Sequence, residues 1–246
     1  MLEVLFHPQP APDYPKTPDL QIEVTDNVAL GASLFPAEPS AAVVLLFHGN
    51  GELAAEYDVV APAYNDLGLS LVVVDYRGYG FSQGTPSASA LLHDARAVFH
   101  TLPPLLEELD IQADRLFVMG RSLGSAAAIE IAATVRHRLS GLILESGFAY
   151  TFPLIQRLGG PVLTKADERR DGFGHLDKMQ HVDVPTLVIH GEEDHLIPVT
   201  DGMALHRHAE SHRKALLTLP GAGHNDLLAT DASAYFDAVA RLVETA

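Results

Sequence analysis

The sequence predicts an α/β fold built on a doubly wound, mostly parallel sheet. Short runs in which every position is apolar recur along the chain, as expected for strands that helices cover on both faces. Longer helix-like stretches separate these runs, and strand alternating with helix implies parallel strands joined by right-handed crossovers. Two segments near the N-terminus alternate apolar and polar residues instead, which adds an antiparallel hairpin to the sheet.

The hairpin comes first in the chain. It follows a proline-rich stretch over residues 8–18, which is typical of a surface loop. Residues Leu20–Val24 alternate apolar and polar, and Val28–Phe35 supplies the second strand. The predicted turn between them is Asp26-Asn27, because these residue types favour tight hairpin turns.

The buried strands and the helices follow in alternation. The remaining predicted strands are Ala42–Phe47, Leu71–Val74, Leu116–Met119, Leu142–Leu144, Thr186–Ile189 and Ala215–Leu219. The predicted helices are Glu52–Leu67, Ala88–Leu102, Ser122–Arg138 and the amphipathic closing helix Asn225–Glu244. Doubly wound sheets place their sites beyond the carboxyl ends of the strands, so reactive residues are expected directly after these runs.

Composition narrows the class of protein. The 246 residues, of which 47% are hydrophobic, fit a single domain over 1–246. A net charge of -16 repels phosphate backbones and anionic membranes, which argues against a nucleic-acid partner. The absence of cysteine excludes disulfides, thiolate metal sites and cysteine nucleophiles. No signal-peptide pattern opens the chain, so a cytoplasmic protein without integral membrane contact is expected.

A nucleophile candidate follows the predicted strand Leu116–Met119. Gly120-Arg121-Ser122-Leu123-Gly124 has the G-x-S-x-G spacing and lies between a strand and a helix. Such a turn is sharp and crowded, so it needs small flanking residues, and it presents the serine oxygen at the sheet edge. The alternative interpretation is a glycine-rich turn in which Ser122 only caps a helix.

A second glycine-rich loop, His48-Gly49-Asn50-Gly51, follows the strand Ala42–Phe47. Glycine permits a close backbone approach, so the amide of Asn50 can point into the site. With the amide of Leu123 it would form a two-donor oxyanion hole. His48 itself is interpreted as a packing residue.

A nucleophilic serine needs a base, and thirteen histidines compete for that role. His224 is favoured because it lies in a flexible loop between the last strand and the last helix. His206, His208 and His212 have spacing that a metal site would also show, but they fall in a late polar helix and are interpreted as surface residues rather than zinc ligands.

The acid that would orient the base is less clear from the pattern alone. Asp194 follows the strand Thr186–Ile189, but Glu192 and Glu193 precede it directly, and Glu145 follows the strand Leu142–Leu144. The chain order serine, acid, histidine is the one expected of a doubly wound hydrolase.

With these motifs the chain, from about Ala41 to the C-terminus, resembles the α/β-hydrolase superfamily. Within it, the chain is similar to the serine-aminopeptidase-like branch, which also holds small esterases and acyl-protein thioesterases. Residues 75–82, DYRGYGFS, resemble that branch's D-x-R-G-x-G-x-S segment, in which the residue corresponding to Arg77 is structural. A second similarity is H-G-x-x-D-x-x-x-P, met by His190, Gly191, Asp194 and Pro198. It implies that Asp194 is the acid of the triad.

The sequence departs from many relatives where they insert a large helical cap. About forty residues, Ser146 to Val184, separate the strands there, so a short lid over about 146–184 is expected. Phe148, Tyr150 and Phe152 are the candidate substrate-binding residues of this lid. The alternative is a plain helical connection that packs on the sheet.

These features predict a serine hydrolase that acts on small-molecule esters or thioesters of small to medium acyl groups. Ser122, His224 and Asp194 would form the catalytic triad, and the resemblance implies that neither a metal nor an organic cofactor is needed. The first alternative is an aminopeptidase in which Glu52 or Glu145 holds a substrate ammonium. The second is a non-catalytic ligand-binding protein on the same fold. The sequence leaves the oligomeric state open.

Overall fold

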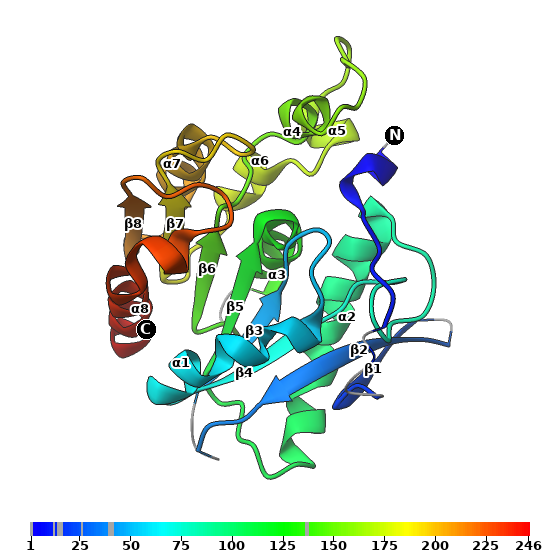
Figure 1. The fold of residues 1–246 in the computed structure, drawn as a ribbon, viewed down its shortest axis with the longest axis vertical. Helices are drawn as coiled ribbons and strands as arrows, with labels where there is room; N and C mark the ends of the chain where they lie inside the picture. The colour runs from blue at the N-terminus through cyan, green and yellow to red at the C-terminus, as the bar shows by residue number, and fades with distance from the viewer. Residues whose placement is uncertain (1, 12, 14–16, 26, 39–41, 136–137) are drawn as a thin grey trace.

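The structure is a computed structural model that describes residues 2–11, 13, 17–25, 27–38, 42–135 and 138–246. Its eight described strands form one sheet in the order β1-β2-β4-β3-β5-β6-β7-β8, in which the pairs β1–β2 and β2–β4 are antiparallel and the other pairs are parallel (Figure 1). The strands are β1 Leu20–Thr25, β2 Val28–Phe35, β3 Ala42–Phe47, β4 Leu69–Val74, β5 Leu116–Arg121, β6 Gly141–Glu145, β7 Thr186–Gly191 and β8 Lys214–Leu219. The predicted fold class is confirmed.

Helices cover both faces of this sheet. The α-helices outside the lid are α1 Ala61–Asp66, α2 Ala88–Glu107, α3 Ser125–Val135, α7 Val199–His208 and α8 Leu227–Thr245. Within the lid lie α4 Thr151–Arg157, α5 Glu168–Asp171 and α6 His175–Met179. The 3-10 helices are η1 Leu2–Leu5, η2 Ala54–Val59 and η3 Ser122–Gly124.

The central strands explain the two layers of helices. In β3, Val43 and Leu45 point to a core that includes residues of α2 and α3, whereas Val44 and Leu46 point to a core that includes residues of α1 and α8. Successive strand residues face opposite sides, so a strand that is apolar at every position needs both covers. All six side chains of β3 are buried.

Two predicted helices differ in detail from those observed. The stretch Glu52–Leu67 forms the short helices η2 and α1 instead of one helix. Pro62 lies at the start of α1, where a missing backbone N–H costs nothing, so the chain restarts a helix there. The predicted helix Ser122–Arg138 begins with the 3-10 turn η3, and positions 136–137 lie outside the described residues, as does Asp26 of the predicted hairpin turn.

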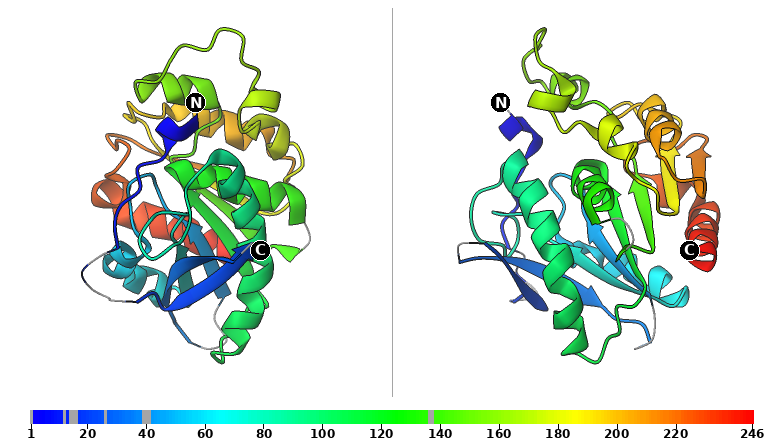
Figure 2. Two further views of the ribbon diagram at one scale, coloured as in Figure 1. Left: turned by 90° about the vertical axis from the view of Figure 1, so that its right-hand side faces the viewer. Right: turned by 180° about the vertical axis from the view of Figure 1, so that it is seen from behind.

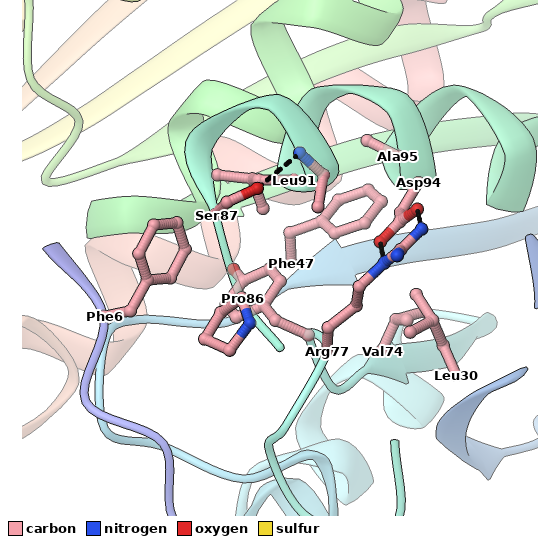
Figure 3. A pocket seen from close by; sticks show the side chains of 12 residues that line it. Phe6, Leu30, Phe47, Val74, Arg77, Pro86, Ser87, Leu91, Asp94 and Ala95 are labelled. Atoms are coloured by element: carbon pink, nitrogen blue, oxygen red, sulfur yellow. Dashed lines mark hydrogen bonds and ion pairs between the residues drawn. The ribbon is translucent and has the colours of Figure 1, made fainter. Parts of the chain in front are cut away.

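Arg77 ties the segment after β4 to helix α2, as its predicted structural role requires. Its Nε and Nη2 atoms donate to the two carboxylate oxygens of Asp94 at 2.6 and 2.7 Å (Figure 3). The same helix begins at the cap residue Ser87, whose hydroxyl accepts the amide hydrogen of Ala90. The ion pair holds α2 beside the segment that leaves β4, and the cap satisfies an amide at the start of the helix.

The lid lies beyond the carboxyl ends of β6, β7 and β8, and the N-terminal segment runs beside it (Figures 1 and 2). This end of the sheet is therefore covered from two sides by segments that are far apart in the sequence. No helix within the described ranges combines the length and the apolarity that a membrane crossing requires.

Candidate active site

Three predicted residues meet at the carboxyl edge of the sheet. The Oγ atom of Ser122 lies 2.9 Å from Nε2 of His224, and Nδ1 of His224 lies 2.7 Å from Oδ2 of Asp194. Ser122 follows β5, Asp194 follows β7, and His224 lies between β8 and α8. The structure thus brings together side chains that are 30 and 102 positions apart into one continuous chain of hydrogen bonds.

The elbow that carries Ser122 is strained and crowded. Ser122 has φ 51°, in the left-handed region that side chains other than glycine rarely adopt. A Cβ atom on Gly120 would overlap the backbone of Gly124, and one on Gly124 would overlap the carbonyl group of Phe47. The G-x-S-x-G spacing is therefore a packing requirement, because the elbow presses against the end of β3.

Asp194 is buried and is held by four donors. Its Oδ1 atom accepts the amide hydrogens of Leu196 and Ile197 at 2.9 and 2.7 Å. Its Oδ2 atom accepts from His224 and lies 3.4 Å from Nε2 of His190. Burial alone raises the pKa of Asp194, but the hydrogen bonds from His190 and His224 outweigh burial and hold this pKa well below its ordinary value. The carboxylate is ionised throughout the neutral range and can orient His224 by accepting its Nδ1–H.

The two predicted oxyanion residues lie on the cavity that contains Ser122. Asn50 and Leu123 line it together with His224. The side chain of Asn50 is fixed, because its Oδ1 atom accepts from the amide of His7 and from the hydroxyl of Tyr79, each at 2.7 Å. His48 is fully buried behind the loop, as its predicted packing role requires.

Arg121, in the elbow that carries Ser122, connects the loop after β3 to the loop that carries His224. Its guanidinium group pairs with Glu52 and, at 3.0 Å, with Glu145. It also donates to the carbonyl oxygen of His224 at 3.2 Å and to Oδ1 of Asn225 at 2.8 Å. Burial alone lowers the pKa of Arg121, but the two carboxylates raise it above its ordinary value, so the cation is permanent. In the sequence, Arg121 is only a variable position of the G-x-S-x-G motif, so its role in the site was not predicted.

Arg121 also binds the carboxylates of Glu145 and Glu52, which the sequence offered for other roles. Glu145, the alternative to Asp194, binds Arg121 and accepts the hydroxyl of Tyr235 at 2.6 Å. Glu52 binds Arg121 and accepts the amide of Gly49 at 2.8 Å. Both carboxylates, which were candidates for holding a substrate ammonium, are engaged by a cation within the protein.

The cavity at Ser122 has a volume of about 210 Å³. Its polar lining consists of Asn50, Glu52, Arg121, Ser122, His224 and Asn225. Five leucines also line it, namely Leu123 of the elbow and Leu5, Leu154, Leu158 and Leu196 from other segments. Leu154 and Leu158 are four positions apart at helix α4, so they share one face of it.

The aromatic residues predicted to bind substrate do not line this cavity. Phe148 is fully buried and packs on Phe173 and His175, with ring centroids 5.6 and 4.4 Å away. Tyr150 is 39% exposed, and Phe152 lies on a different face of α4 from Leu154. The structure therefore assigns Phe148 to the core and the lining of the cavity to leucines. Within α4, the helix periodicity separates Phe152 from Leu154, which lines the cavity.

The lid contains a buried histidine whose charge should affect stability. His175 is 1% exposed, and burial lowers its pKa from the ordinary 6.5 to about 3, although Nδ1 lies 2.6 Å from the carbonyl oxygen of Phe148. The unfolded chain therefore binds a proton at this ring between pH 6.5 and pH 3, and the folded chain does not.

From this difference we expect the free energy of unfolding to fall as the pH falls from 7 to 4.5, with a contribution from His175 of about 2–3 kcal/mol. Urea unfolding at several pH values should show this slope in the wild type and a shallower slope in His175→Gln. Equal slopes in the two proteins would contradict the assignment.

The histidines with metal-like spacing do not gather into a site. His206 and His208 lie in the last turn of α7, and His212 lies beyond that helix. Nδ1 of His208 is 2.8 Å from the carbonyl oxygen of Ala204. The described part of the chain contains no group of three or more His, Cys, Asp or Glu side chains that could hold a metal ion.

Comparisons with known proteins agree with the fold described above. The family described as serine aminopeptidase, S33, matches residues 38–168 and 175–231, about three quarters of the chain. An uncharacterized protein of Mycobacterium tuberculosis is 33% identical over 231 residues, which cover 93% of this chain and 80% of that protein. The protein bem46 of Schizosaccharomyces pombe is 28% identical over 229 residues, which cover 90% of this chain and 74% of that protein.

Solved structures share the fold. An esterase of Pyrococcus furiosus, Pf2001, has a TM-score of 0.76 at 18% identity, with 98% of each chain covered. A soluble variant of the monoglyceride lipase of Saccharomyces cerevisiae has a TM-score of 0.71 at 18% identity, with 97% of this chain and 98% of that chain covered. From the extent of the family match, the chain belongs to the serine aminopeptidase S33 family of the α/β-hydrolase superfamily and is a hydrolase.

Proposed function

We propose that the protein is a serine hydrolase that cleaves carboxylic esters or thioesters of small to medium acyl groups. The single observation that carries this proposal is the hydrogen-bonded chain from Ser122 through His224 to the ionised Asp194. Its order of groups matches the requirement for an activated nucleophile: a hydroxyl, a base within reach and an acid that orients the base.

In the proposed reaction, Oγ of Ser122 bonds to the carbonyl carbon while its proton passes to Nε2 of His224. The carbonyl oxygen becomes an oxyanion that the amides of Asn50 and Leu123 stabilise. When the bond to the alcohol or thiol breaks, His224 returns the proton to the leaving group and an acyl-enzyme remains. Water then attacks the acyl-enzyme, loses its proton to His224 and releases the acid, and the proton returns to Ser122.

The size of the cavity supports a limited acyl length. About 210 Å³ is a little more than the roughly 150 Å³ of an apolar cavity that admits benzene. The net charge of -16 disfavours anionic substrates, and Arg121 on the cavity wall is already paired with Glu52. An uncharged ester of a C2 to C8 acid fits these features. A peptide substrate fits less well, since Arg121 already engages the carboxylates that would hold its ammonium group.

The test combines labelling with turnover. We expect a fluorophosphonate probe to modify Ser122, located by mass spectrometry of the labelled peptide. In a panel of p-nitrophenyl esters from acetate to palmitate, kcat/KM should rise to a maximum at or below C8, and an alanyl anilide should be a poor substrate. Absence of labelling would favour a ligand-binding protein, and preference for the anilide would favour a peptidase.

A further inference from the structure

The N-terminal segment lies on the cavity that contains Ser122. Helix η1, Leu2–Leu5, packs beside α4, and the two views of Figure 2 show this segment next to the lid. Leu5 is 1% exposed and lines the cavity although 117 positions separate it from Ser122 in the chain. It completes an apolar wall whose other members come from α4 and from the loop after β7.

The backbone of the N-terminal segment binds the loop over residues 48–51, which carries Asn50. The amide of His7 donates to Oδ1 of Asn50 at 2.7 Å and lies 2.6 Å from the hydroxyl of Tyr79. The amide of Gly80 donates to the carbonyl oxygen of Gln9 at 2.9 Å. His7 and Tyr79, which bind Asn50, therefore also hold the segment that carries Leu5. The apolar wall and the proposed oxyanion hole depend on the same contacts.

The lining of the cavity contains two chemical kinds of residue. Ser122, His224 and Asn50, with the charged residues Glu52 and Arg121, supply polar groups. Leu5, Leu154, Leu158 and Leu196, together with Leu123 of the elbow, supply apolar side chains that have no hydrogen-bonding group. A wall of this kind binds a saturated chain by burial alone, and it gains with each methylene until the chain reaches the end of the cavity.

We propose that Leu5 is a specificity-determining residue and that the N-terminal segment, with Leu154, Leu158 and Leu196, forms the acyl subsite for an uncharged aliphatic chain of about four to eight carbons. This inference rests on the proposed ester hydrolysis and adds the class of acyl group and the segment that selects it. The subsite is incomplete without the first turn of the chain.

The first experiment changes the wall and measures acyl preference. Leu5→Trp should narrow the subsite and lower the ratio of kcat/KM for octanoate to that for acetate at least about tenfold, since each buried methylene contributes roughly fourfold. Leu5→Ala should shift the preferred ester toward longer chains. The matched control is Phe6→Leu, because Phe6 lies in the same segment but lines a separate small cavity beside α2 (Figure 3).

The control variant should keep the wild-type ratio. If Phe6→Leu shifts the ratio as much as Leu5→Trp does, the segment acts only as a support and the assignment of Leu5 is overturned. An unchanged ratio in a Leu5→Trp protein that melts near the wild-type temperature also overturns it.

A second readout needs no turnover. The Ser122→Ala protein should bind octanamide at least about tenfold more tightly than butanamide in calorimetric titrations, and the added change Leu5→Trp should remove this preference. If the wild type shows neither labelling nor ester hydrolysis, the proposed function fails, and the titrations still decide whether the leucine wall binds an aliphatic chain. Equal binding of the two amides to the Ser122→Ala protein would overturn the subsite.

Discussion

Replacing Ser122 by alanine is expected to lower kcat for ester hydrolysis by about 10⁶-fold while the protein stays folded. The hydroxyl is the only side-chain group in the proposed mechanism that bonds to the acyl carbon, so no other member of the triad can substitute for it. Its contact with His224 contributes about 1 kcal/mol to stability, and the melting temperature should change by no more than about 4 °C. Steady-state kinetics and a thermal melt of the purified variant test both statements.

The backbone at Ser122 allows a sharper comparison. Glycine adopts a φ of 51° without the penalty that alanine incurs, so Ser122→Gly should melt at least as high as Ser122→Ala although both variants are inactive. A lower melting temperature for Ser122→Gly would mean that the elbow stores no strain.

Ser146 provides a matched control for the nucleophile. It follows β6 with φ 47°, is fully buried, and its hydroxyl has no hydrogen-bond partner among the described residues. Ser146→Ala should retain ester hydrolysis and fold at least as stably as the wild type, because it removes an unsatisfied polar group. Substantial activity in purified Ser122→Ala would instead point to another nucleophile.

The strands could be predicted because their pattern is local. Every residue of β3 and β4 is buried, and a continuous apolar run has few other interpretations in a chain of this composition. Helix ends were less predictable. Helix α2 continues to Glu107 through Pro103 and Pro104, beyond the predicted end at Leu102. Leu106 lies in the added turn and is fully buried, and this packing offsets the backbone hydrogen bonds that the prolines remove.

The residues of the site also differ in how far the sequence could predict them. Ser122 and His224 could be found because each lies in a loop that directly follows a strand, and their neighbours have small side chains for local steric reasons. The choice of Asp194 over Glu145 needed the family resemblance, because both follow strands. The contacts of Arg121 could not be predicted, since its partners lie at the end of β6 and in the loops that follow β3 and β8, and they meet only in the folded chain.

The substrate cavity was the least predictable part. The aromatic residues of the lid were the predicted substrate-binding residues, yet Phe148 faces the core, and leucines from separate segments line the cavity. Leu5 belongs to no motif, and the backbone contacts of His7 and Gln9 hold its segment at the site. Long-range packing decides such positions, and a single sequence carries no periodic signal for it.

Asp194→Asn is expected to lower kcat by about 10⁴-fold. The environment of Asp194 fixes the orientation of the substituted amide. Oδ1 accepts the amide hydrogens of Leu196 and Ile197, so the carbonyl oxygen of the asparagine must stay there. The amide nitrogen then faces Nδ1 of His224 as a donor. The imidazole must accept at Nδ1 and carry its proton on Nε2, where it can no longer receive the proton of Ser122.

Glu145→Gln is the matched control, since Glu145 was the rival acid. It keeps the shape of the side chain that binds Arg121 and Tyr235. Neither ring nitrogen of His224 is hydrogen-bonded to Glu145, because Nδ1 contacts Asp194 and Nε2 contacts Ser122. The effect of Glu145→Gln on kcat should be far smaller than that of Asp194→Asn, although its melting temperature should fall below that of the wild type because a buried ion pair is broken. Both variants should be compared by kcat and by the rate of fluorophosphonate labelling, which also needs an activated Ser122. If Glu145→Gln abolishes labelling and Asp194→Asn does not, the acid of the triad is Glu145, and the hydrogen bond from His224 to Asp194 has another purpose.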